Sequence, residues 1–96
     1  MDGPARELRR AVDRLVSLGP ARLVRVDADG SSPHDRVQVW LQDLAGLAAA
    51  GAAPVVPRLA PHAVPDQVVV LTREALDGAG LADEVARRLV ELRRAL

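Results

Sequence analysis

Two histidines, His34 and His62, are the side chains of this chain that ordinarily titrate near neutral pH. Together with Asp35 and Asp66 they would offer nitrogen and oxygen ligands to a metal ion. Neither histidine, however, has a second ligand three or four residues away on a clear helical face, which is the spacing of a helix-borne metal site. We therefore predict no metal site, and we place His34 in the first turn of a helix and His62 in a loop.

The other groups that could support catalysis are equally unpromising. Ser17, Ser31 and Ser32 lie outside any Gly-x-Ser-x-Gly motif, and Ser32 has an ordinary role as a helix cap before Pro33. The glycines stand singly at expected helix ends, so no glycine-rich phosphate loop is present. The chain has no cysteine, which removes thiolate ligands, disulfides and cysteine nucleophiles. We therefore expect a non-catalytic protein without a cofactor.

Arginine supplies all 13 basic residues, and it occurs in pairs at 9–10, 87–88 and 93–94. Such pairs contact phosphates in nucleic-acid-binding proteins. Here acidic residues lie between them, and 13 acids bring the formal net charge to zero, so a continuous positive face is not expected. We do not expect a nucleic acid partner. A DNA-binding regulator with a helix-turn-helix in its first three helices remains an alternative hypothesis.

Large apolar residues that recur at helical spacing are the candidate interface residues. The only aromatic residue is Trp40, whose neighbours on a predicted helix favour the core, with an interface anchor as the alternative. A regular seam follows at the C-terminal end, and such a seam packs inside its own chain or against a second copy. We predict the second arrangement. The seam, in steps of four, four, three and four, is Leu81, Val85, Leu89, Leu92 and Leu96.

Proline marks the starts of the predicted helices, because a missing N–H is harmless at the first helical position. Four prolines stand at such starts, at positions 4, 20, 33 and 65. Apolar spacing of three and four predicts helices over 4–18, 33–50, 65–78 and 81–96. Glycines 19, 51 and 78 are their expected ends.

Two segments read almost equally well as strands. Residues 20–29 share the GPAR opening of the first helix, which favours helix, although Val24, Val26 and Ala28 alternate with charged residues. The run of apolar residues at 68–71 also suits a buried strand, but its Pro-Asp-Gln opening favours helix. We predict helix in both cases.

Prolines 54, 57 and 61 exclude a long helix over residues 52–64. An extended, partly polyproline crossover is expected there, with Val55, Val56 and Leu59 lying on the body of the protein.

The predicted fold is a single domain, residues 1–96, in the form of a compact all-α bundle of four to five helices with a proline-rich crossover loop. The alternative is an α+β fold with strands near 21–28 and 67–72. No apolar stretch is long enough for a membrane span, and the opening MDGPARELRR lacks the apolar core of a signal peptide. We therefore expect a cytoplasmic protein with no membrane partner.

The predicted function is a small non-catalytic protein-interaction or assembly module of a bacterium with a GC-rich genome. A core of alanine, valine and leucine leaves a chain of 96 residues little stability to spare. Self-association through the C-terminal helix would add stability, so a homo-oligomer or a protein partner is expected. The alternatives are the DNA-binding regulator and a small-molecule-binding or enzymatic protein with a pocket between the crossover and the helix that carries Trp40.

Overall fold

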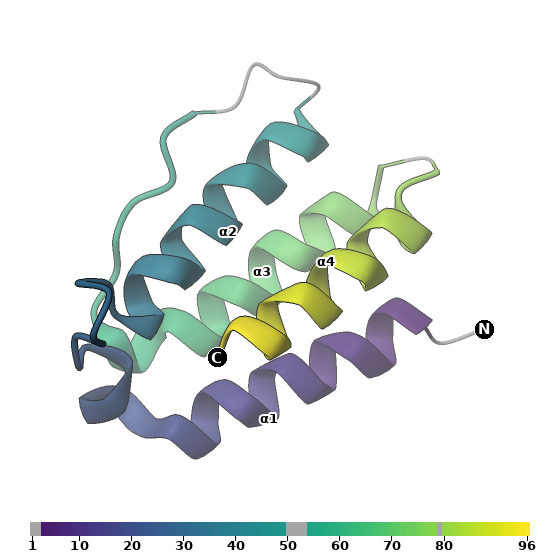
Figure 1. Cartoon of the computed structure of the whole chain (residues 1–96). Helices are drawn as coiled ribbons and strands as arrows, with labels where there is room; N and C mark the ends of the chain where they lie inside the picture. The colour runs from purple at the N-terminus through teal and green to yellow at the C-terminus, as the bar shows by residue number, and fades with distance from the viewer. Residues whose placement is uncertain (1–2, 50–53, 79) are drawn as a thin grey trace.

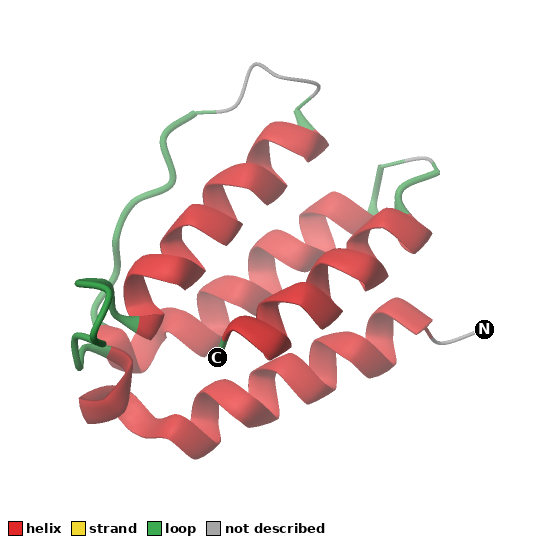
Figure 2. Ribbon diagram, viewed as in Figure 1, coloured by secondary structure: helices red, strands yellow, loops and turns green. Residues whose placement is uncertain are grey.

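The computed structural model describes residues 3–49, 54–78 and 80–96, and these ranges are helical with short connections (Figure 1). The helices are α1 (Gly3–Leu23), α2 (Pro33–Ala48), α3 (Val64–Leu76) and α4 (Ala82–Ala95), with a 3₁₀ turn, η1 (Pro61–Ala63), before α3. No strand occurs in the described ranges (Figure 2). The all-α fold with a proline-rich crossover is therefore confirmed. The α+β alternative is wrong, because residues 67–72 lie inside α3.

A kink divides α1 at Gly19, whose backbone has φ 76° and ψ 161°. A positive φ costs glycine little and other residues much, which explains why glycine stands there. Pro20 then begins one further turn, which ends at Leu23. The helix expected over 20–29 is therefore only one turn long. The loop that replaces it is closed by a hydrogen bond of 2.7 Å from the Asp27 amide to the Ser31 carbonyl.

The start of α2 has the Ser32 cap that its sequence predicts, and Asp35 completes it as a capping box. The Ser32 hydroxyl accepts a hydrogen bond from the Asp35 amide, and the Asp35 carboxylate accepts one from the Ser32 amide, at 3.1 and 2.9 Å. These two bonds satisfy backbone donors that a helix N-terminus leaves free. They fix the point from which α2 runs to Ala48. Gly51, its expected end, lies outside the described residues.

The hydrophobic core is densest between α1 and α4, which lie side by side and make the most extensive contact of any two elements (Figure 1). Ala11 and Leu15 of α1 are buried there, together with Leu89 and Leu92 of α4. On the other side of the bundle α2 packs on α3, and the extended crossover, residues 54–60, returns the chain from one to the other. None of the helices in the described part of the chain is long and apolar enough to cross a membrane.

Candidate functional site: an apolar groove beside the crossover

An apolar groove of about 570 Å³ lies between the C-terminal part of α2, the α3 helix and the crossover segment (residues 54–60). The wall at the end of α2 consists of Ala45, Ala48 and the C-cap residue Ala49. Because these side chains are a single methyl group, they do not fill the space in front of α3. The groove thus exists where α2 changes from leucine and valine to alanine.

The α3 wall carries a stripe of three residues at steps of four, Asp66, Val70 and Glu74. Residues four apart lie on the same face of a helix, so the stripe places an apolar side chain between two carboxylates. Val70 is 54% exposed. Among the described residues neither carboxylate takes part in a hydrogen bond or an ion pair. The sequence analysis missed this stripe, although its spacing was visible.

The third wall is the crossover, and two glutamines one turn apart hold it against α2. Gln38 donates from Nε2 to the Val56 carbonyl at 2.8 Å. Gln42 donates to the Pro54 carbonyl at 3.1 Å and accepts from the Val56 amide at 2.8 Å. A proline-rich segment cannot satisfy these groups internally, because the extended conformation makes no hydrogen bonds of its own. The two glutamines therefore hold the crossover in place as a wall of the groove, because they bind backbone groups that water would otherwise bind.

The far end of the crossover is fixed in the same way. Gln67 of α3 donates from Nε2 to the Pro57 carbonyl at 2.8 Å, and Arg58 pairs with Asp35 at 2.8 Å. The guanidinium acts together with the Ser32 amide, which is the larger effect, to lower the pKa of the Asp35 carboxyl. The crossover is thus tied to both helices that line the groove.

Val56 is the one crossover residue between 54 and 60 whose side chain is buried in the core. Val56 is buried, whereas Val55 is 87% exposed and Leu59 is 38% exposed. The expectation that all three lie on the body is wrong for Val55, because it and its neighbour Val56 point to opposite sides of an extended chain. Val55 and Leu59 both line the groove and leave apolar surface in contact with solvent.

The residues considered for catalysis or metal binding lie in separate environments. His34 is buried at the start of α2, where burial first and then Arg58 lower the pKa of its imidazole, while His62 is exposed in η1. In the described ranges no group of three His, Asp or Glu residues is placed to hold a metal ion. Ser32 is engaged in the α2 cap, and Ser31 donates from its hydroxyl to Asp29.

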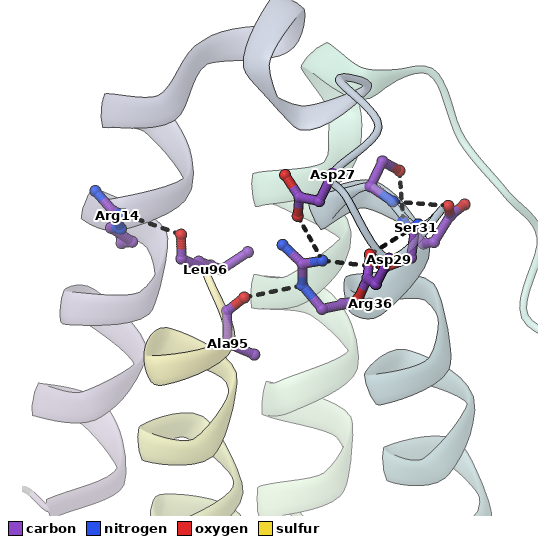
Figure 3. A network of polar contacts seen from close by, with 9 residues as sticks. Arg14, Asp27, Asp29, Ser31, Arg36, Ala95 and Leu96 are labelled. Carbon is purple, nitrogen blue, oxygen red and sulfur yellow. Dashed lines mark hydrogen bonds and ion pairs between the residues drawn. The ribbon is translucent and has the colours of Figure 1, made fainter.

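Two arginines, Arg14 and Arg36, connect other helices to the C-terminal end of α4. Figure 3 shows Arg36 of α2 donating to the Ala95 carbonyl at 2.9 Å while it pairs with Asp27 at 2.9 Å. Arg14 of α1 donates to the Leu96 carbonyl at 2.9 Å. Cationic donors at the C-terminus of a helix satisfy its last carbonyls and interact favourably with its dipole. Among the predicted arginine pairs, Arg88 binds Glu84 and Arg93 lies 3.5 Å from Glu7.

The candidate interface residues of the sequence analysis lie on the opposite side from the groove, between α4 and the rest of the bundle. Val85, Leu89 and Leu92 are buried in the core, while Leu81 and Leu96 are half-buried against it. Trp40 is half-buried too, and its indole N–H donates to the Arg88 carbonyl of α4 at 2.8 Å. These side chains therefore already have partners within the chain.

Comparisons of the chain with known protein families, with curated proteins and with solved structures find no match. Its function is therefore inferred from the residues and the groove alone.

Proposed function

We propose that this protein is a non-catalytic interaction module that binds an apolar segment of a partner protein in the groove between α2, α3 and the crossover segment. The observation that carries the proposal is a preformed apolar concavity of about 570 Å³ with exposed valines on two of its walls. Concave surface lined mainly by apolar side chains is the usual form of a binding site in a protein. An interaction module is also the function expected from the sequence. The sequence analysis placed the binding surface on the C-terminal helix, whereas we propose the groove.

Pre-organisation supports binding at this place. Side-chain amides from α2 and α3 already hold the crossover, so a partner does not have to order that wall. Avoiding the entropy of ordering a loop is a general route to higher affinity. The groove is therefore already formed before the partner binds, and no loop has to close over it.

A small apolar molecule is the second candidate occupant. The volume falls in the range of about 300 to 1,000 Å³ that is typical of ligand pockets. Such pockets usually contain a few convergent polar groups that orient the ligand. Here Gln67 donates from Nε2 to the Pro57 carbonyl, and its Oε1 has no hydrogen-bond partner but is buried, so it is not presented to the groove. The other polar side chains of the lining are the carboxylates of α3. This composition favours a protein segment, because a segment is oriented by several side-chain contacts along its length and needs fewer polar groups.

The test is a peptide-display selection on the purified protein, followed by affinity measurements on two matched variants. Val70→Gln removes apolar surface inside the groove, whereas Val39→Gln makes the same change at a 63% exposed position of α2 that does not line it. Loss of a buried valine contact is worth about 1.5 kcal/mol or more, so Val70→Gln should weaken recovered peptides about tenfold. Val39→Gln should leave them unchanged. Equal binding to both variants would place the interaction elsewhere and overturn the proposal.

A further inference from the structure

The backbone groups of the crossover indicate the conformation of the groove's occupant. Extended peptides bind by adding main-chain hydrogen bonds to an exposed edge. In the crossover, the carbonyls of Pro54, Val56 and Pro57 and the amide of Val56 are already used by glutamine side chains. The two prolines have no N–H to offer. The other two walls are helices, whose backbone is bonded internally, so the remaining groups of a single wall, the crossover, are the main-chain partners left for an extended peptide.

An α-helix has no such requirement, because it satisfies its own backbone. It binds through side chains at positions i, i+3, i+4 and i+7 that enter an apolar groove. The groove walls offer side-chain surface of this kind from Ala48, Val55, Val70 and Leu71. A helix is therefore the form of protein segment that matches this groove.

The charge of the lining indicates the second property of the occupant. Its charged side chains are two carboxylates, Asp66 and Glu74, and none of its described members is an arginine. The two lie eight positions apart on α3, which corresponds to about 12 Å along a helix. Two turns of a partner helix cover nearly the same distance. Basic side chains two turns apart would therefore meet both carboxylates, and acidic side chains would be repelled.

From these observations we infer that the occupant is a basic amphipathic α-helix of another protein, with apolar anchors in the groove and lysine or arginine beside Asp66 and Glu74. The inference rests on the proposed interaction function and specifies its partner class. A second copy of this chain is a poorer match. Its arginine-rich helices α1 and α4 turn their apolar faces into their own core, where Leu15 and Leu89 are buried.

The experiment uses two synthetic peptides of about 15 residues, each with leucine at i, i+3, i+4 and i+7. They differ only in the flanking residues, which are lysine in one and glutamate in the other. Binding is measured by fluorescence anisotropy to the wild type and to two double variants. Asp66→Asn with Glu74→Gln removes the groove carboxylates, and Asp13→Asn with Glu91→Gln makes the same charge change at exposed residues of α1 and α4, which do not line the groove.

We expect the lysine peptide to bind the wild type at least about tenfold more tightly than the glutamate peptide, which corresponds to about 1.4 kcal/mol. The groove double variant should reduce this preference to about threefold or less, because the remaining attraction is long-range and screened by salt. The control double variant should retain the preference. Val70→Gln should weaken both peptides.

The contradicting outcomes separate the partner class from the function. Equal affinity of the two peptides, with both weakened by Val70→Gln, would overturn the basic partner and leave the interaction function standing. Binding that Val70→Gln does not change, or no binding of either peptide, would count against the function as well. Undiminished binding of a lysine peptide with a central proline, which cannot form the helix, would overturn the helical occupant. Concentration-dependent dimers that Val70→Gln dissociates would identify a second copy as the occupant instead.

Discussion

The two sides of this bundle are built from similar amphipathic helices, yet one side is closed and the other is open. Between α1 and α4, leucines and valines at helical spacing interlock and are buried. Between α2 and α3, the last turns of α2 present Ala45, Ala48 and Ala49, and a proline-rich segment stands where a further helix would pack. The comparison teaches that side-chain size along a helix, and not apolar periodicity alone, decides whether its face is closed or left as a groove.

The largest effect should come from breaking the closed side. Leu89 is fully buried, so Leu89→Asp would bury an unpaired carboxylate, and even Leu89→Ala should cost about 2 to 5 kcal/mol. Because small domains have only about 5 to 15 kcal/mol of stability, Leu89→Asp should abolish the helical circular dichroism signal at 25 °C. Val70→Asp, on the open side, should retain it. A Leu89→Asp protein that stays fully helical and monomeric would show that this seam is not part of the fold.

A smaller effect is expected from releasing the wall of the open side. Gln42→Ala removes both hydrogen bonds that this side chain makes to the crossover, which should cost about 1 to 3 kcal/mol locally. The Val56 amide should exchange its hydrogen faster, as followed by NMR, while amides of α1 and α4 keep their rates. Gln42→Glu is the informative companion, since it retains the acceptor for the Val56 amide and loses the donor to Pro54. Unchanged exchange at Val56 in Gln42→Ala would contradict the role given to the glutamine pair.

The free energy of unfolding should depend on pH through His34, which is buried at the start of α2. Burial and Arg58 lower the pKa of the His34 imidazole below its usual 6.5, so the folded state binds this proton less readily than the unfolded state does. The free energy of unfolding is then fully retained above pH 6.5 and falls as the pH drops below it. His34→Gln should flatten this part of the profile in urea titrations. A slope that is the same in the wild type and in His34→Gln would contradict the assignment.

A second decrease is expected at lower pH. The Ser32 amide and Arg58 lower the pKa of Asp35 below 3.8, so its contribution is present above that pH and is lost as the pH falls through the lowered pKa. Asp35→Asn should make this acid limb of the profile shallower. If the limb has the same steepness in both proteins, the capping box does not depend on the charged carboxylate.

The smallest effect on stability is expected from Val70→Gln, the variant that should weaken binding most. Val70→Gln and Val39→Gln both replace an exposed valine on a helix, so each should change the free energy of unfolding by no more than about 0.5 kcal/mol. Thermal denaturation of the two variants measures this. A large loss of stability in Val70→Gln alone would mean that the groove wall is part of the core.

Local signals predicted most of the fold, because a proline stands in the first turn of α1, α2 and α3. Ser32, Pro33 and Asp35 specify the entry of α2 without help from the rest of the chain. The length of the helix after Pro20 was not predictable in this way. It depends on the turn between Asp27 and Ser31 and on Arg36, which reaches from α2 to the end of α4.

The candidate site was less accessible to sequence reasoning. The seam at Leu89 and Leu92 has the same pattern whether it packs inside a chain or between chains, so spacing could not decide where it lies. The role of Gln38 and Gln42 could not be predicted from their sequence positions. It follows only from the path of the crossover along α2, where both side chains bind its backbone. A pocket between the crossover and the helix that carries Trp40 was one of the alternatives drawn from the sequence, but its α3 wall and its alanine lining depend on tertiary packing.

The most direct test of the central claim is a methyl NMR footprint of the wild-type protein, labelled at valine and leucine, during titration with a peptide recovered by display. We predict that the largest shifts occur at Val55, Leu59, Val70 and Leu71, which line the groove, and that Val24 and Val39, which are exposed but lie outside it, barely move. Shifts concentrated on Val24 and Val39, with the groove methyl groups unchanged, would contradict the claim that this protein binds its partner between α2, α3 and the crossover segment.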